Sequence, residues 1–186
     1  MAAPSLVFGL GGTIETAFVP LRLFELLADY AVESGVALTR EAETFVSPVA
    51  LEGLTGRAPY RGNAQFEAGV PVHLSWAEAL LLVIVPGTAR LLTECAGGSI
   101  TCPVTRLFAF TDKARIVFAP ALHPRFDLRI YRPQLERLRE LGVTVLGGED
   151  GHADWAELRQ VLLERLQPPR REGAGRTVLL DALRAR

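Results

Sequence analysis

Residues 80–88 read Leu-Leu-Leu-Val-Ile-Val-Pro-Gly-Thr, and they carry the strongest strand signal in the chain. Its first six residues are all apolar, so a strand formed here has no polar face and is buried on both sides. This is typical of a central strand in a parallel sheet. Pro86-Gly87 then ends the strand, and residues 88–96 have the pattern of a helix. The segment therefore predicts a strand-to-helix unit at the centre of an α/β domain.

The rest of the chain repeats this alternation of short apolar runs and longer helical patterns. Predicted strands are 6–10, 36–38, 115–119 and 143–146; predicted helices are 14–33, one opening at Ser47-Pro48, 88–96, 103–110, 131–141 and 155–166. Pro20 removes one backbone hydrogen bond, so the first helix is expected to start properly near Val19. The fold class is α/β, a Rossmann-like or flavodoxin-like three-layer fold with a mainly parallel sheet.

Length and composition indicate one domain. The chain has 186 residues, of which 49% are hydrophobic, and this is sufficient for a single core. We predict a domain over residues 1–166, followed by a linker and C-terminal tail over 167–186. The Pro- and Gly-containing part, 167–175, reads as linker, and 177–184 as a short helix.

Charge and cysteine content exclude several classes of protein. The formal net charge of −1 and the lack of a basic stripe exclude a nucleic-acid partner. No secretory signal pattern opens the chain and its longest apolar run is far too short to span a membrane, so a cytoplasmic location without membrane attachment is expected. Cys95 and Cys102 are too few for a disulfide framework and lack partners for a metal site; both are expected to be buried apolar filler.

Four loops follow predicted strands, where ligands of doubly wound sheets bind. The first contains Gly12 and Thr13 at the start of a helix, where backbone N–H groups and a hydroxyl can hold a phosphate. A G-x-G-x-x-G fingerprint is missing, so an ordinary tight turn with a helix cap remains an alternative.

Two histidines are candidate catalytic residues. His73 ends a Gly/Pro-rich loop before the central strand, and His123 follows the strand at 115–119. An imidazole at either place can act as general base or polarise a substrate. A purely structural histidine is the alternative for both.

The order of these motifs resembles the homo-oligomeric flavin-containing cysteine decarboxylases. The matching segments are Gly12-Thr13-Ile14, Phe45-Val46-Ser47-Pro48, His73, Pro86-Gly87-Thr88-Ala89, Pro120-Ala121-Leu122-His123 and Gly142-Val143-Thr144-Val145. The resemblance covers about residues 5–148. The family includes phosphopantothenoylcysteine decarboxylase and enzymes that oxidatively decarboxylate C-terminal cysteines of lanthipeptide-like precursors.

The resemblance implies FMN as cofactor and gives roles to individual positions. It implies that Gly12, Thr13 and Ser47 hold the FMN phosphate, that Pro86, Gly87 and Thr88 line the flavin, and that His73 is the catalytic histidine. Two asparagines of the family are replaced in this chain. Arg90 stands in place of one, and His123 stands in place of the asparagine that contacts the substrate carboxylate. Arg90, His123 and Arg125 are the expected substrate-binding residues, since each can bind a carboxylate. His123 is also a candidate catalytic residue. The segment that clamps substrate in the family is shortened here to residues 147–150.

The implied function is FMN-dependent oxidative decarboxylation of the C-terminal cysteine of a ribosomal precursor peptide to an enethiol, as in aminovinyl-cysteine formation. In the coenzyme A pathway, the enzyme of this family also reduces the enethiol, and it uses a cysteine of the clamp segment. No cysteine follows Cys102 in this chain, so the peptide class, which releases the enethiol, fits better. The expected partners are the precursor peptide, further copies in a trimer or dodecamer, and other biosynthetic enzymes. The alternatives are a flavin- or substrate-binding relative without decarboxylase activity that acts as a partner subunit, and a flavin prenyltransferase-like enzyme.

Overall fold

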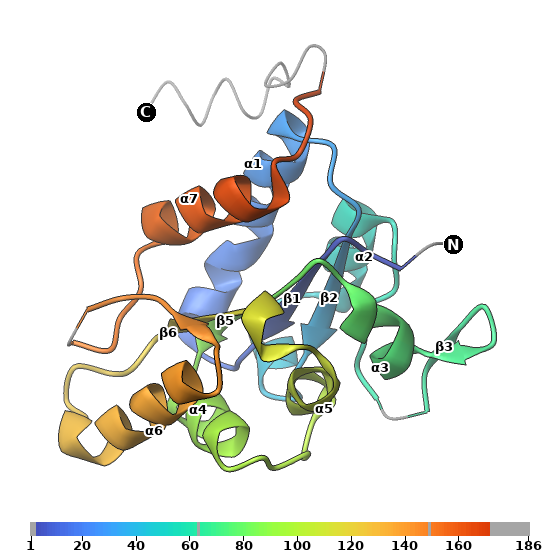
Figure 1. Cartoon of the computed structure of the whole chain (residues 1–186). Coiled ribbons are helices and arrows are strands. Elements are labelled where there is room, and N and C mark those ends of the chain that lie inside the picture. The colour runs from blue at the N-terminus through green and yellow to red at the C-terminus, as the bar shows by residue number, and fades with distance from the viewer. Residues whose placement is uncertain (1–2, 63, 149, 172–186) are drawn as a thin grey trace.

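A five-stranded parallel sheet forms the centre of the molecule (Figure 1). The computed structural model describes residues 3–62, 64–148 and 150–171. Its strands are β1 (Leu6–Leu10), β2 (Ser34–Leu38), β5 (Leu81–Gly87), β6 (Ile116–Pro120) and β7 (Thr144–Val145). Their spatial order is β2-β1-β5-β6-β7, and all neighbours are parallel. The predicted fold class is confirmed, with β5 as the central strand.

Helices cover both faces of the sheet and make three layers (Figure 1). One face carries α1 (Val19–Asp29), α2 (Pro48–Thr55) and α7 (Trp155–Leu166); the other carries α3 (Val72–Ser75), α4 (Ala89–Ala96), α5 (Pro103–Phe110) and α6 (Leu128–Glu140). Short 3-10 helices are η1 (Ile14–Phe18), η2 (Ala42–Thr44), η3 (Trp76–Glu78) and η4 (Lys113–Arg115), and β3 (Phe66–Glu67) pairs with β4 (Val70–Pro71) in a small hairpin. No helix in the described part of the chain combines the length and apolarity needed to cross a membrane.

The two sides of the sheet bury separate cores because successive residues of a strand point to opposite faces. On β5, Leu82 and Ile84 belong to the core under α4 and α5, whereas Leu81 and Val83 belong to the core under α1 and α7. This explains why the central strand has no polar position.

Helix starts follow local signals. The first α-helix begins at Val19, as predicted, with Pro20 in its first turn, where no backbone N–H is required. The helix predicted from residue 131 begins three residues earlier, at Leu128. Asp127 caps it, because its Oδ1 accepts the backbone N–H of Arg129 at 3.1 Å.

The chain after α7 turns back onto the molecule. The backbone N–H of Ala31 donates to the carbonyl of Pro169 at 2.9 Å, and that of Arg171 donates to the carbonyl of Asp29 at 3.1 Å. Residues 167–171 of the predicted linker are therefore held against the end of α1. The rest of that linker and the predicted helix 177–184 lie outside the described residues.

A buried charge cluster holds the hairpin and α3 against the sheet. The Arg57 guanidinium is 4% exposed and donates to Glu67 Oε1 at 2.8 Å and to Glu33 Oε2 at 3.1 Å. The other oxygen of Glu67 accepts the indole N–H of Trp76 at 2.8 Å. Trp76 is buried and leads directly into the central strand. Glu67 thus links β3 to the segment that carries His73.

Replacing Glu67 with alanine leaves the Arg57 charge buried with one partner fewer, and removes the acceptor for Trp76. We expect Glu67→Ala to lower the free energy of unfolding by about 3 kcal/mol, measured by urea denaturation. Glu52→Ala, at an exposed position of α2, is the control and should change stability little. Equal losses in both variants would contradict the role given to Glu67.

Candidate functional site

The sheet order creates a crevice at one edge. The chain leaves β1 towards β2 on one side and leaves β5 towards β6 on the other, so strand order reverses between β1 and β5. In open α/β sheets, ligands bind outside the carboxyl ends of the strands at this point. The loops after β1, β2, β5 and β6 therefore define the candidate site.

A cavity of about 320 Å³ lies among these four loops, and we call it the switch cavity. It is lined by Gly12, Thr13, Thr39, Glu41, Thr88, Ala89, Arg90, Leu91, Ala121, His123 and Phe126. Five of the sequence-predicted site residues thus share one cavity: Gly12, Thr13, Thr88, Arg90 and His123. Its volume is at the lower end of the range of small-molecule sites.

Glycines allow the loops to meet. A Cβ on Gly12 would lie 2.3 Å from the Cβ of Glu41, so only glycine lets the loop after β2 pack here. The loop after β1 is also tied down internally, because the Thr16 hydroxyl donates to the carbonyl of Gly11 at 2.5 Å and accepts the backbone N–H of Thr13 at 3.3 Å. The wall of the cavity is therefore preformed.

Arg90 is held between two carboxylates at the cavity wall. Its Nη1 donates to Glu41 Oε1 at 2.6 Å, and its Nε donates to Glu94 Oε1 at 2.8 Å. The hydrogen bond from Arg90 to Glu94 is the largest of the effects that raise the pKa of Arg90 above its usual range. The cavity is therefore lined by a guanidinium together with Gly12 and Thr13, and by the acidic side chain of Glu41, which the sequence did not indicate.

His123 has a defined ring orientation. Its Nδ1 accepts the backbone N–H of Arg125 at 3.1 Å, and its ring lies 5.9 Å from that of Phe126. In the neutral ring the proton is therefore on Nε2, which can donate one hydrogen bond. The Arg125 side chain does not line the switch cavity. What Arg125 contributes here is its backbone N–H.

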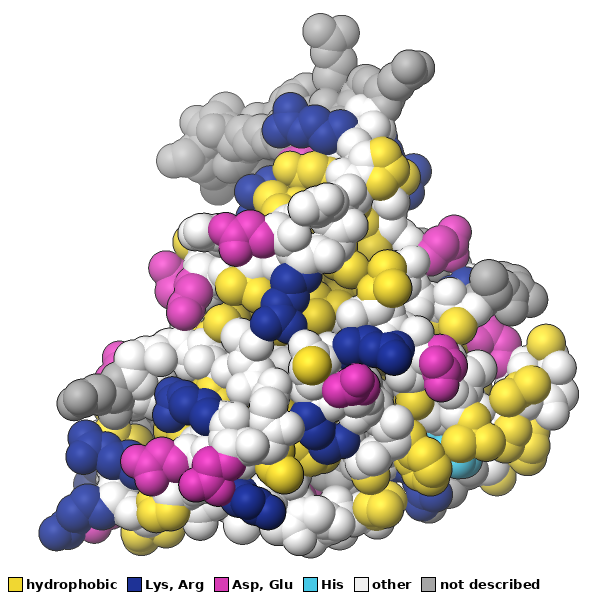
Figure 2. Space-filling model, in the orientation of Figure 1, with side chains coloured by type: hydrophobic (Ala, Val, Ile, Leu, Met, Phe, Trp, Pro, Cys, Tyr) yellow, Lys and Arg dark blue, Asp and Glu magenta, His cyan; other side chains and the backbone are white. Residues whose placement is uncertain are grey.

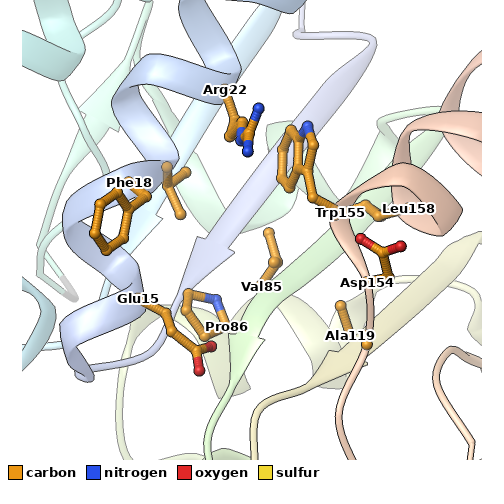
Figure 3. Close-up of a pocket in the computed structure, with 11 residues that line it drawn as sticks. Glu15, Phe18, Arg22, Val85, Pro86, Ala119, Asp154, Trp155 and Leu158 are labelled. Atoms are coloured by element: carbon orange, nitrogen blue, oxygen red, sulfur yellow. The ribbon is translucent and has the colours of Figure 1, made fainter.

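Pro86 borders a second cavity, of about 240 Å³, on the other side of the end of β5 (Figure 3). We call it the Trp155 cavity. Figure 3 shows Glu15 and Phe18 from η1 and Arg22 from α1 on one side, with Trp155 and Asp154 opposite and Val85, Pro86 and Ala119 between them. Sequence analysis missed this cavity, because the start of α7 meets η1 only in the folded chain.

Gly87 and Ser47 line neither of these cavities. A Cβ on Gly87 would lie 2.5 Å from the Phe118 ring, so this glycine serves the packing of β5 on β6. Ser47 is exposed at the start of α2. Thr39, directly after β2, is the hydroxyl residue of this loop that lines the switch cavity. The position of Thr39 at the end of a strand is the signal that could have identified it.

His73 lies apart from these residues. It is in α3, before the amino end of β5, whereas the switch cavity is at the carboxyl end, about 20 Å away along a seven-residue strand. Its ring packs on Phe110, with 5.1 Å between centroids, and its Nδ1 is buried without a hydrogen-bond partner. The catalytic role that the resemblance gives to His73 would place it near the carboxyl-end loops, but within one chain it does not line the switch cavity, because the helical turn containing His73 comes before β5 and not after it.

In the described part of the chain, the cysteines and acidic residues form no metal site. Cys95 is buried, which raises the pKa of its thiol, and Cys102 is half-buried at the start of α5; both are free thiols. Among residues 3–62, 64–148 and 150–171, no three His, Cys, Asp or Glu side chains are grouped so that they could hold a metal ion.

Comparison with known proteins gives one family. The family model described as Flavoprotein matches residues 2–166. The chain is 26% identical over 151 residues to the coenzyme A biosynthesis bifunctional protein CoaBC of Haemophilus influenzae, covering 78% of this chain and 37% of that protein. It is 28% identical over 192 residues to CoaBC of Mycobacterium tuberculosis, and the match covers 95% of this chain and 45% of that protein. The chain thus spans less than half the length of these curated relatives.

Solved structures share the fold. The FMN-dependent cysteine decarboxylase SpaF superposes with a TM-score of 0.75 at 24% identity, covering 89% of this chain and 98% of that one. TvaF, an FMN-dependent cysteine decarboxylase from thioviridamide biosynthesis, superposes with a TM-score of 0.73 at 24% identity, and the match covers 87% of this chain and 95% of that one. At these identities the likeness extends to the fold alone.

The environment of His73 predicts its titration. Burial disfavours the imidazolium, and the nearby Arg106 charge adds to this, so the pKa of His73 is below the usual 6.5. Proton NMR should show a titration midpoint below 6.5. Arg106→Gln should raise the midpoint without restoring the usual value, and Arg115→Gln should leave it unchanged. A wild-type midpoint at or above 6.5 would contradict this environment.

Proposed function

The chain belongs to the flavoprotein family, and from this premise we propose that it is an FMN-dependent decarboxylase acting on a C-terminal cysteine. The substrate is the end of a peptide, and the product is an enethiol. The observation that carries the proposal is the switch cavity, which gathers Gly12, Thr13, Thr88, Arg90 and His123 at the strand-order reversal.

The cavity has the donors and the apolar surface that FMN requires. The hydroxyls of Thr13, Thr39 and Thr88 and the guanidinium of Arg90 line it, and these groups suit phosphate oxygens. Ala89, Ala121 and Phe126 supply apolar surface for a ring system. When bound, FMN supplies an acceptor for two electrons. The residues present therefore fit this cofactor.

His123 is proposed to hold the substrate carboxylate. With Nδ1 occupied by the backbone N–H of Arg125, a neutral His123 donates from Nε2, and a protonated His123 adds a positive charge. Either form binds a carboxylate. This is the role that the resemblance gives to an asparagine at this position.

His73 is proposed to act from a second copy of the chain. Within one copy it lies at the opposite end of β5 from the switch cavity, so it can serve only a neighbour's site. Its surroundings suit an interface: Phe66, Val70, Leu74 and Phe110 are 42–62% exposed around it. Figure 2 shows hydrophobic side chains gathered on that side of the molecule, where Figure 1 has α3 and the hairpin. A homo-oligomer would cover them.

The proposed reaction removes two electrons from each substrate, so the reduced flavin would have to be reoxidised by dioxygen before the next turnover. The cysteine would lose its Cβ–H and S–H hydrogens as two electrons and two protons and become a thioaldehyde; bound FMN would supply the acceptor for the electrons. His73 of the neighbouring copy takes the thiol proton. The Cα–carboxylate bond then breaks, CO2 leaves, and the electron pair forms the enethiolate. A peptide substrate is favoured because the enethiol is the final product, and no cysteine after Cys102 is present to reduce it.

The direct test is mass spectrometry of a peptide ending in cysteine. The protein is purified with FMN bound, which is identified by flavin absorption at roughly 450 nm. It should lower the mass of the peptide by about 46 Da, the sum of CO2 and two hydrogens. The same peptide ending in serine is the control and should not change. FMN bound with no product would contradict the decarboxylase activity.

Mixing two inactive variants tests the shared site. His73→Asn should keep FMN but lose 10²- to 10⁴-fold of the rate, roughly the worth of a general base. Thr13→Asp should lose FMN, because its carboxylate faces the phosphate, while keeping His73. Co-expressed copies should recover about a quarter of the wild-type rate. A working site needs an intact flavin cavity from a His73→Asn copy and an intact His73 from a Thr13→Asp copy, and random assembly brings these together in about one site in four. No recovery would show that His73 does not act across copies.

One observation favours an inactive flavin-binding relative as the second candidate. Arg90 is paired with both Glu41 and Glu94, so the residue that replaces a family asparagine already has two carboxylate partners. Such a protein would serve as a partner subunit, and the mass-spectrometric test separates the two functions.

A further inference from the structure

Glu41 lies beside Gly12, one of the residues expected to hold the flavin phosphate. Its backbone packs directly on Gly12, so that a Cβ on Gly12 would be 2.7 Å from the Glu41 carbonyl carbon. Glu41 lines the switch cavity together with Gly12 and Thr13. A carboxylate and a phosphate repel each other, so both cannot occupy this corner as anions.

The same carboxylate is held in place by Arg90. Their 2.6 Å contact joins the loop after β2 to the first turn of α4, which are 49 residues apart in sequence. Both residues line the switch cavity and also a neighbouring cavity of about 370 Å³ that contains Arg40, Arg61 and Cys102. The Glu41–Arg90 pair is thus the partition between two cavities.

The charges around Arg90 oppose phosphate binding as they stand. One guanidinium faces two carboxylates, Glu41 and Glu94, so the group has a net charge of −1 before any ligand arrives. Both oxygens of Glu94 are already hydrogen-bonded: one accepts from Arg90, and the other accepts from the Thr101 hydroxyl at 2.7 Å. Of the two acidic residues paired with Arg90, Glu41 lines the switch cavity and Glu94 does not.

The Glu41–Arg90 contact is of the kind that exchanges partners easily. The two side chains are 52% and 54% exposed. Ion pairs this exposed contribute only about 0–1 kcal/mol to stability, and a phosphate offers arginine a stronger, two-point partner. Exchange of one anion for another is therefore feasible without disturbing the fold.

We infer that Glu41 is an internal counter-ion that competes with the flavin phosphate for Arg90. Binding of the phosphate turns Arg90 from Glu41 to the ligand, and Glu41 swings out of the corner beside Gly12. Glu41 thereby lowers the affinity for phosphorylated flavin and has no such effect on a flavin that lacks phosphate. This inference rests on the proposed flavin site.

The test compares FMN with riboflavin, which differs only in lacking the phosphate. Affinities of the flavin-free protein for both are measured by quenching of flavin fluorescence. Glu41→Gln removes the competing charge and should tighten FMN binding about tenfold while changing riboflavin binding less than about twofold. Arg90→Gln should weaken FMN binding about tenfold, again without an effect on riboflavin.

Glu94→Gln is the matched control. It removes the other carboxylate partner of Arg90, and Glu94 does not line the switch cavity. It should change the FMN affinity less than Glu41→Gln does. FMN binding that appears only in Glu41→Gln would also support the inference, since the competing carboxylate would then prevent binding in the wild type.

Equal FMN affinity in wild type and Glu41→Gln would overturn the counter-ion role and leave the proposed function standing. A gain for riboflavin as large as that for FMN would overturn it too, because the effect would not depend on the phosphate. Absence of binding of either flavin to wild type and all three variants would contradict the flavin site itself, and the counter-ion role with it.

Discussion

The close approach of three loops at the end of β1 is the constraint on which the rest of the site depends. A Cβ on Gly11 would lie 2.5 Å from the carbonyl oxygen of Pro86, and one on Gly12 would lie 2.3 Å from the Cβ of Glu41. Contacts this short leave no room for a side chain at either position. Glycine therefore lets the loops after β1, β2 and β5 form one continuous wall, on which threonine hydroxyls and Arg90 are presented together.

Two groups of ion pairs serve different purposes because their exposure differs. The Arg57 guanidinium is buried against Glu67, and removal of one partner from such a pair costs about 3–5 kcal/mol. Arg90 and Glu41 are half-exposed, where a pair contributes about 0–1 kcal/mol. The first group fixes the hairpin and α3 in place. The second can exchange partners, and so it suits a site that must admit an anion.

The two candidate catalytic histidines lie at opposite ends of the sheet, and this separation shapes the proposed function. His123 follows β6 and lines the switch cavity, whereas α3 with His73 comes before β5. A reaction that uses both requires two copies of the chain. The exposed apolar side chains around His73 suit such an assembly, since an uncovered patch of this kind is costly in water.

The order and type of most elements follow from the sequence, because strand burial and helix capping are local; α3 and the β3–β4 hairpin were not predicted. The apolar run at 80–85 predicted β5, although the strand begins at Leu81 and continues through Pro86 to Gly87, and the proline at position 20 predicted the start of α1. It also indicated Gly12 and Thr13, since loops after parallel strands gather at one edge. Folding brings about the rest: the pairing of Glu41 with Arg90, the Trp155 cavity, the place of Thr39, and the distance of His73 from the site. These depend on contacts between residues far apart in the chain, and no pattern within a single segment encodes which loops meet.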